Sequence, residues 1–366
     1  YYIARTTDTA AFADARCAEF AAGVAADWDA AYAKAIGEGL ERYCAGTYRA
    51  SSFRSAPTAG VVDAVPVDRF VRPADAETPD PDDHIPWIPG IDLATRESAS
   101  LPAEFVVFPP PEERFAPAIT TGLGLGNSTA EAALSGLYET VERDASMLSW
   151  YSTFEPMGLT VDDGGFETLR KRAGAEDLSV TTLLLTQDVD VPVVGAAVHR
   201  DAETGEWPRF AMGSAADLDA AAAARSALAE ALQNWMELRA MGPEQASREE
   251  GAIGSYADFP ERVREFVSPE VRLPAADVTD GEAADLDGVA AVEAVVDRLS
   301  TADLDAYAAR LTTRDVAALG FEGVRVLVPG AQPLFTADPF FGDRLETVSA
   351  SMGFEPRPER AYHPFP

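Results

Sequence analysis

The stretch GLGLGNSTAEAALSGLYETVERDASMLSWY, from Gly122 to Tyr151, decides the fold of this chain. It opens with a glycine-rich turn that has a glycine at every second position up to Gly126. Ser128 is the predicted N-cap of a helix, because Glu131 stands three residues later and completes a capping box. The residues that follow are rich in alanine and leucine, which favour helix. We therefore predict one long helix that ends near Tyr151.

Three polar side chains of this helix lie on one face. Ser135, Glu139 and Glu142 are four and three residues apart, and an α-helix places such positions side by side. Two neighbouring carboxylates repel each other unless a cation lies between them or Arg143 balances their charge. Apolar residues surround this face, which indicates partial burial. Buried pairs of acids often mark metal binding or other functional chemistry, although an exposed helix also carries this spacing by chance.

The same arrangement of polar residues occurs three times. Counted from the N-cap, it occupies positions +7, +11, +14 and +15, and the first three form one stripe along a helix. The copies are 101 and 91 residues apart, too far for a solenoid repeat. One copy alone is typical of a solvated face, but three predict related helix-bearing units whose polar stripes converge. The copies are Asp27, Lys34, Glu38, Glu41 and Arg42; Ser128, Ser135, Glu139, Glu142 and Arg143; and Asp219, Ser226, Glu230, Gln233 and Asn234.

These motifs give the chain a resemblance to a known family. The set Ser135-x-x-x-Glu139-x-x-Glu142-Arg143 and Ser226-x-x-x-Glu230-x-x-Gln233 resembles the YcaO family of ATP-dependent enzymes that modify peptide backbones. The stretch AIGEGLERYC, from Ala35 to Cys44, is similar to the first helix of that family. The resemblance implies an α/β (α+β) fold, with three related helix-bearing units packed on mainly antiparallel sheet. It also implies a single domain over residues 1–366.

Three positions depart from the family pattern or leave it open. In the family a turn with glycine and lysine precedes the first helix, but residues 22–25 read Ala-Gly-Val-Ala, and Lys34 is expected to supply a cation instead. The phosphate-contacting arginine of the family corresponds to Arg248, which we favour, or to Arg262, which matches the spacing Arg-x-x-x-Phe. Azoline-forming members end in P-x-P-x-P, of which only Pro364-x-Pro366 is present.

The residue types fit binding of ATP with Mg²⁺. No Walker A loop is present, because no lysine follows the glycines of residues 122–127. Mg²⁺ binds oxygen ligands and retains phosphates and waters in its shell, so two or three glutamates suffice. The expected metal ligands are Glu38, Glu41, Glu139, Glu142 and Glu230. The expected ATP-binding residues are Lys34, Arg42, Asn127, Ser135, Arg143, Ser226, Gln233 and Arg248.

The resemblance also implies the reaction. ATP phosphorylates the oxygen of a backbone amide, which makes that oxygen a good leaving group, and a nucleophile attacks the carbon to give a thioamide or an azoline. One alternative is an accessory protein without catalysis, for example one that supports methylthiolation of a ribosomal protein. Another is an acidic α/β protein whose glutamates bind salt cations. The expected partners are a peptide or protein substrate, a sulfur-delivery (TfuA-like) or leader-peptide-binding protein, and a second copy in a homodimer.

The composition limits the class of protein. Among 366 residues there are 61 Asp and Glu against 29 Lys and Arg, and the net charge of −32 argues against nonspecific binding of nucleic acid. Only Lys34 and Lys171 are lysines, and such an acidic, lysine-poor chain is typical of adaptation to high intracellular salt, as in halophilic archaea. No apolar run is long enough to span a membrane. Cys17 and Cys44 form no disulfide framework, which fits a reducing cytoplasm.

The rest of the chain predicts further helices and strands. Because the first residue is Tyr1 rather than Met, the native N-terminus is expected to be missing. Residues 73–83 are rich in Pro and Asp and form a predicted loop. Additional helices are expected at 28–44, 166–173, 219–241 and 301–312, and strands at 101–108, 180–186, 191–199, 209–213 and 324–330.

Overall fold

Two sheets and a strand pair form the β-structure in the described part of the chain. The computed structural model describes all residues except 201–205, 249–252, 336 and 366. The first sheet has the order β10-β9-β8-β7-β11, and the second has the order β3-β4-β12-β13-β6, with β5 paired to β4. All pairings are antiparallel except that of β11 with β7, which confirms a mainly antiparallel α/β fold. The strands are β1 (Tyr2–Arg5), β2 (Phe20–Gly23), β3 (Arg54–Pro57), β4 (His84–Asp92), β5 (Ser98–Pro102), β6 (Leu123–Gly126), β7 (Met157–Thr160), β8 (Ser179–Leu184), β9 (Val193–His199), β10 (Phe210–Ala216), β11 (Arg272–Pro274), β12 (Tyr307–Arg310) and β13 (Glu322–Leu327).

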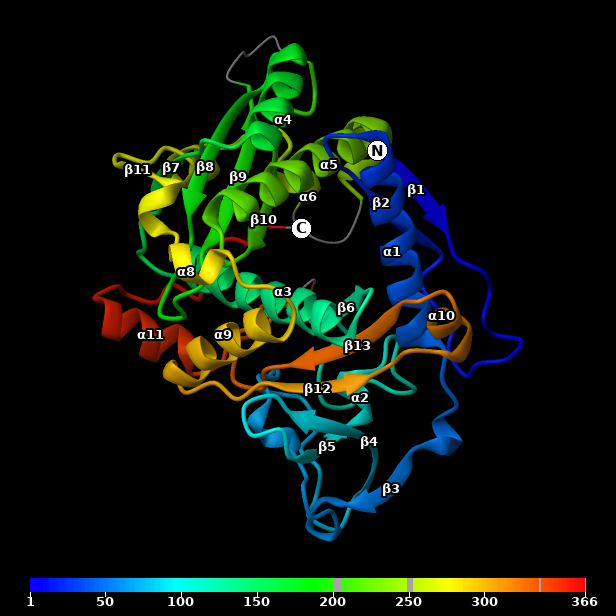
Figure 1. Cartoon of the computed structure of the whole chain (residues 1–366). Helices are drawn as coiled ribbons and strands as arrows, with labels where there is room; N and C mark the ends of the chain where they lie inside the picture. Colours follow the sequence, from blue (N-terminus) through cyan, green and yellow to red (C-terminus); the bar gives the residue numbers. More distant parts are fainter. Residues whose placement is uncertain (201–205, 249–252, 336, 366) are drawn as a thin grey trace.

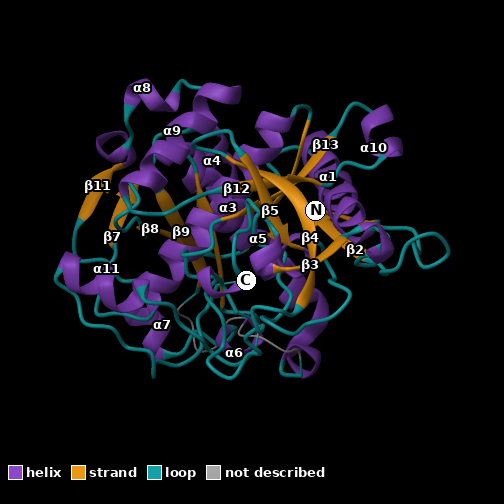
Figure 2. Ribbon diagram, turned by 90° about the horizontal axis from the view of Figure 1, so that it is seen from below, coloured by secondary structure: helices purple, strands orange, loops and turns teal. Residues whose placement is uncertain are grey.

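Helix α3 lies between the two sheets. It packs against β6 and β13 on one side and against β9 and β10 on the other, as Figure 1 shows. Figure 2 shows the same elements from below. Leu137, Met147 and Trp150 of this helix are fully buried in the largest apolar core. The α-helices are α1 (Trp28–Gly46), α2 (Ala103–Val106), α3 (Thr129–Trp150), α4 (Gly164–Ala175), α5 (Ala220–Ala246), α6 (Ile253–Tyr256), α7 (Glu261–Phe266), α8 (Gly281–Ala284), α9 (Gly288–Thr301), α10 (Arg314–Ala318) and α11 (Arg344–Met352).

The three predicted motif helices are α1, α3 and α5, and each begins at its predicted cap. The side chains of Asp27, Ser128 and Asp219 each accept a hydrogen bond from a backbone N–H in the first helical turn. Glu131 accepts from the N–H of Asn127 rather than from that of Ser128, so the capping box is displaced by one residue. Helix α5 leaves helical geometry at Gly242, which matches the predicted end near Met241.

The glycine-rich stretch is a strand, and its prediction as a turn is wrong. Residues 123–126 form β6, which pairs with β13. The glycines are needed because α3 lies against this strand. A Cβ on Gly124 would lie 2.1 Å from the carbonyl oxygen of Ala132, and one on Gly136 would lie 2.5 Å from that of Gly122. This spacing therefore reflects close packing of a strand on a helix.

Two other predictions need correction. The prediction of a helix at 301–312 is wrong, because α9 ends at Thr301. Residues 307–310 instead form the strand β12, which pairs with β4 on one edge and β13 on the other. The alanines there favour helix, but pairing on both edges decides the structure. The strand expected at 101–108 is β5 only as far as Pro102, after which α2 begins. Residues 73–83 contain no helix or strand, as predicted.

Candidate functional site

The three motif helices converge on one polar cavity of about 810 Å³. In Figure 1, α5 lies above α3, and α1 lies to their right, so each helix contributes one side. Most of the residues predicted for the site line this cavity, including all five glutamates. The predicted residues that it contains are Lys34, Glu38, Glu41, Arg42, Ser135, Glu139, Glu142, Arg143, Ser226, Glu230 and Gln233.

One glutamate of each helix is fixed by the strand that precedes the helix. Oε2 of Glu38 accepts a hydrogen bond of 3.0 Å from the backbone N–H of Ala22 at β2. Glu139 accepts one of 3.0 Å from the N–H of Gly122, next to β6. Glu230 accepts one of 2.7 Å from the N–H of Ser214 in β10. The three units therefore share one internal geometry, in which a strand amide holds the +11 carboxylate at the cavity.

A second layer of contacts surrounds Glu142, which is 8% exposed. The hydroxyl of Ser214 donates to Oε1 of Glu142 over 2.7 Å, which links α3 to the strand that holds Glu230. Nη1 of Arg143 lies 3.4 Å from the same oxygen, and its Nη2 lies 3.9 Å from Glu139. On α1, Arg42 lies 3.5 Å from Glu38, and this pair has the same four-residue spacing as Arg143 and Glu139 on α3.

Burial raises the pKa of three cavity carboxyls, those of Glu41, Glu142 and Glu230. For Glu41 burial raises the pKa to about 8, against the opposing charge of Arg42. For Glu142 burial also raises the pKa to about 8, and the charge of Glu230 adds to this effect. The pKa of Glu230 is raised for the same reason. Ionisation of these buried carboxyl groups costs free energy when the cavity holds no cation. A cation in the cavity makes their ionised form favourable.

Besides Arg42 and Arg143, one lysine and one arginine add positive charge near these acids. Lys34 lies among the lining residues, and burial, followed by the charge of Arg225, lowers its pKa. Arg325 lies on β13 and is 3% exposed, and burial lowers its pKa to about 10 while the charge of Glu139 opposes this shift. Its Nη2 donates to the carbonyl of Ile119, whereas its Nε and Nη1 have no hydrogen-bond partner.

Sequence reasoning missed Arg325 as a site residue. The available signal was a single arginine inside the apolar run Val324-Arg-Val-Leu-Val, which we interpreted only as a buried strand. A guanidinium in such a strand needs an anionic partner. The carboxylates of Glu41 and Glu139 supply negative charge nearby, and a phosphate group would supply more.

Three candidate residues lie elsewhere. Asn127 donates from its backbone and side chain to Glu131, and so belongs to the cap of α3. Arg248 pairs with Glu244 at 2.6 Å on the exposed surface beyond α5. Arg262 lies over the ring of Tyr256, 4.8 Å from its centroid. The structure does not bring them to the cavity. Of the partial Pro-rich tail, Pro366 lies outside the described residues.

The donor set fits a Mg²⁺–nucleotide complex better than a metal held by protein alone. Within the described part of the chain, no group of three or more His, Cys, Asp or Glu side chains is arranged to hold a metal ion. Mg²⁺ commonly binds through one or two carboxylates together with phosphates and water. Carboxylates on three helices, with arginines between them, suit such shared coordination.

Comparison with known proteins assigns the chain to a protein family. The YcaO cyclodehydratase family, described as ATP- and Mg²⁺-binding, matches residues 22–332. The chain belongs to the YcaO family. This result confirms the family suggested by the motifs, and ATP and Mg²⁺ as its cofactors.

Two solved structures share this fold. A heterocyclase in complex with substrate and cofactor matches with a TM-score of 0.77 and 23% identity, over 92% of this chain and 48% of the other. The YcaO protein of Methanopyrus kandleri, bound with AMPPCP and Mg²⁺, matches with a TM-score of 0.61 and 28% identity, over 83% and 76% of the two chains. This YcaO chain therefore spans about half the length of the heterocyclase.

Two relatives by sequence are uncharacterized proteins. One, from Methanothermobacter thermautotrophicus, is 30% identical over 69% of this chain and 67% of its own length. The other, from Rhizobium leguminosarum bv. trifolii, lies in the tfuA 3′ region and is 27% identical over 49% of this chain and 42% of its own length. In the described part of this YcaO chain, no helix is both long and apolar enough to cross a membrane.

Proposed function

We propose that this YcaO chain uses ATP with Mg²⁺ to phosphorylate the oxygen of a peptide backbone amide, so that a nucleophile can replace it and leave a thioamide or an azoline. The observation that carries the proposal is the set of three carboxylates, Glu38, Glu139 and Glu230, each held around one cavity by a backbone amide in or next to the preceding strand. The choice of ATP and Mg²⁺ as cofactors is supported by membership of a family that binds both.

The cavity residues have distinct roles in this proposal. Glu38, Glu139, Glu142 and Glu230, together with Glu41, would hold Mg²⁺ that neutralises phosphate charge. The arginines and the lysine would bind phosphate oxygens, since a guanidinium matches a phosphate with two parallel hydrogen bonds. Ser135, Ser226 and Gln233 offer neutral hydrogen bonds to nucleotide or metal-bound water. The charged residues are Lys34, Arg42 and Arg143 in the cavity wall and Arg325 on β13, which faces the charge of Glu139.

The proposed reaction conserves atoms and charge. The amide oxygen of the substrate forms a bond to the γ-phosphorus, and the bond to the β,γ-bridging oxygen breaks, which releases ADP. The nucleophile forms a bond to the amide carbon, and the carbon–oxygen bond breaks with release of phosphate. Proton loss from the nucleophile and nitrogen gives an azoline when a substrate Cys, Ser or Thr attacks. Hydrosulfide as nucleophile gives a thioamide. The protein contributes positioning and charge neutralisation.

The nucleophile comes from outside this chain. Cys17 and Cys44 are both buried, and no cysteine is among the cavity-lining residues. A substrate side chain or a sulfur-delivery partner must therefore provide it. A TfuA-like partner is the proposal for the thioamide product, prompted by the tfuA-region relative. A leader-peptide-binding protein is the corresponding proposal for the azoline product, and a homodimer of single-domain chains remains proposed.

Calorimetric titration of Mg-ATP tests the site. We expect saturable binding to the wild type, loss of binding in Glu139→Ala, and unchanged binding in Glu244→Ala. Glu244 is the matched control because its carboxylate is exposed, pairs with Arg248 and lies outside the cavity. Equal binding by the Glu139 variant would overturn the assignment.

Mass spectrometry of peptides tests the reaction. The chain is incubated with Mg-ATP and a pool of Cys-containing synthetic peptides, with and without sulfide. Replacement of oxygen by sulfur indicates thioamidation, and loss of water indicates an azoline. Binding of ATP without a mass change, with sulfide and candidate partners present, would favour the accessory role.

A further inference from the structure

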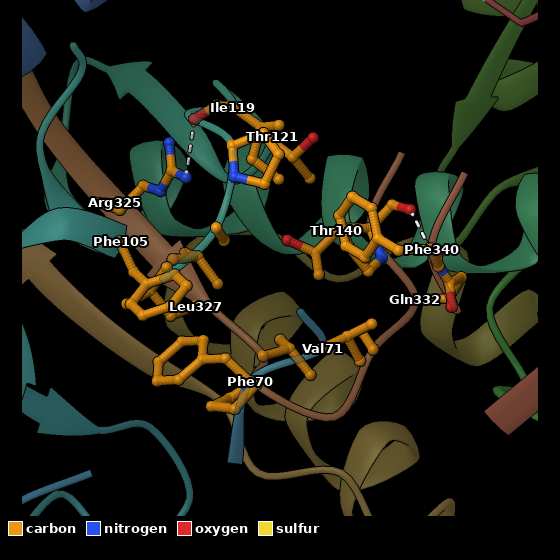
Figure 3. Close-up of a pocket in the computed structure, with 17 residues that line it drawn as sticks. Phe70, Val71, Phe105, Ile119, Thr121, Thr140, Arg325, Leu327, Gln332 and Phe340 are labelled. Atoms are coloured by element: carbon orange, nitrogen blue, oxygen red, sulfur yellow. Dashed lines mark hydrogen bonds between the residues drawn. The ribbon is translucent and has the colours of Figure 1, made fainter. Parts of the chain in front are cut away.

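A second, apolar pocket lies beside the polar cavity (Figure 3). Its volume is about 70 Å³. Its walls come from the segment after residue 69, from α2, from β13 and the loop that follows it, and from the segment 116–121. Ile119 and Thr121 line both the pocket and the cavity. The segment 116–121 is therefore a partition between them.

The walls of this pocket are mainly apolar, and Arg325 is the one charged residue among them. The rings of Phe70 and Phe105 stack with centroids 4.0 Å apart and an interplanar angle of 9°. Figure 3 shows Phe70, Phe105, Leu327 and Val71 along one side and Phe340 on the other. None of the lining residues is acidic, although the chain carries 61 Asp and Glu. The aromatic and aliphatic side chains that make up most of the lining suit an apolar group.

The pocket lies next to the proposed reaction site. Thr140, which lines the pocket, directly follows Glu139, which lines the cavity. Arg325 lines the pocket, donates to the carbonyl of Ile119 in the partition, and faces the charge of Glu139. A group in the pocket is thus one residue of α3 away from a proposed metal ligand.

The volume restricts what the pocket can hold. A volume of about 70 Å³ is roughly half that of an apolar cavity of about 150 Å³ that binds benzene. A side chain between alanine and valine in size fits this space, whereas a purine ring or a phenyl group does not. The adenine of ATP therefore belongs in the larger cavity, and the apolar pocket is left for the other substrate.

We propose that this pocket receives the small apolar side chain of the peptide residue next to the activated amide, and so determines which peptide sites are modified. The inference rests on the proposed function, because it assumes a peptide substrate. Seating that side chain beyond the partition positions the adjacent amide oxygen toward the cavity carboxylates. A hydrophobic pocket discriminates by roughly 10- to 200-fold for one methylene group.

Peptide-dependent release of ADP tests this inference. The probes are synthetic hexapeptides with one fixed Cys, in which each residue flanking the Cys is in turn Ala, Val, Leu, Phe or Asp, with Mg-ATP and sulfide present. For the wild type we expect at least a tenfold preference for Ala or Val over Leu, Phe and Asp at one flanking position. Phe70→Ala enlarges the pocket and should shift the preference to Leu or Phe. Val71→Leu narrows it and should restrict the preference to Ala.

The outcomes separate the two proposals. Titration with Mg-ATP should give the same affinity for the wild type and both variants, since neither residue lines the cavity. Peptide-stimulated ADP release with identical side-chain preferences in all three proteins would overturn the pocket assignment and leave the proposed function standing. A preference for Asp would also overturn it. No stimulation of the wild type by any hexapeptide, with the candidate partner proteins also present, would overturn both.

Discussion

The free energy of unfolding should depend on pH through Glu142. This carboxyl is 8% exposed, and burial raises its pKa from 4.5 in the unfolded chain to about 8. Between these values the folded chain holds a proton that the unfolded chain has released, so stability falls as pH rises. The slope is about 1.4 kcal/mol per pH unit for one such group. The wild type therefore loses about 2–3 kcal/mol between roughly pH 5.5 and 7.5 through this residue.

Replacement by glutamine isolates this contribution. Glu142→Gln keeps the shape and a neutral hydrogen-bond acceptor for Ser214, but it cannot titrate. Urea unfolding, followed by fluorescence of the five tryptophans, is measured for both proteins at several pH values and one fixed KCl concentration. The variant should gain about 2–3 kcal/mol relative to the wild type across the interval. Glu244→Gln, on the exposed surface, is the control and should follow the wild type.

Mg-ATP should reverse the effect at the alkaline end. A ligand that binds only the folded state raises its stability by mass action, and a cation favours the ionised carboxylate. The gain with Mg-ATP at about pH 7.5 should be larger for the wild type than for Glu142→Gln. Parallel pH profiles of the two proteins without ligand would refute the reasoning, because they would show that Glu142 titrates alike in both states.

Three further predictions concern packing and charge. Gly124→Ala places a methyl group 2.1 Å from the carbonyl oxygen of Ala132 and should cost about 2–3 kcal/mol in urea unfolding, whereas Gly174→Ala, with open space at its Cβ, should not destabilise. Arg344→Met leaves Asp144 and Asp188 without their buried partner and should cost about 3–5 kcal/mol, while Arg248→Met should change stability by less than about 0.5 kcal/mol. Arg325→Met should lower kcat for peptide-dependent ADP release at least tenfold without loss of stability, and full activity in this variant would exclude the arginine from catalysis.

The motif helices were predictable because their signals are local. Caps and a polar stripe at fixed offsets depend on helix geometry alone, so α1, α3 and α5 and their convergence could be inferred from the sequence. The strand β12 could not be inferred, since residues 307–310 favour helix and are extended only because β4 and β13 pair with them. High-salt adaptation and the homodimer stay predictions.

The cavity was predictable in part. The glutamates were found from the pattern, but the strand amides that hold three of them were not, because a backbone donor has no sequence signature. Arg325 was missed for a related reason: its strand β13 is far from the motif helices in sequence, and it reaches the site through tertiary packing on α3 and pairing with β6. Asn127 and Arg248 were assigned from sequence position, and the structure places them in local contacts instead.

The bonds from strand amides to glutamates also make the site observable by NMR spectroscopy. The N–H groups of Ala22, Gly122 and Ser214 each point at a carboxylate oxygen, and an amide that donates to an ionised acceptor forms a shorter, stronger bond. Each amide proton resonance should therefore shift when charge on its own glutamate changes. Three backbone signals, one from each unit, would report in which order the three carboxylates respond as Mg²⁺ and nucleotide are added.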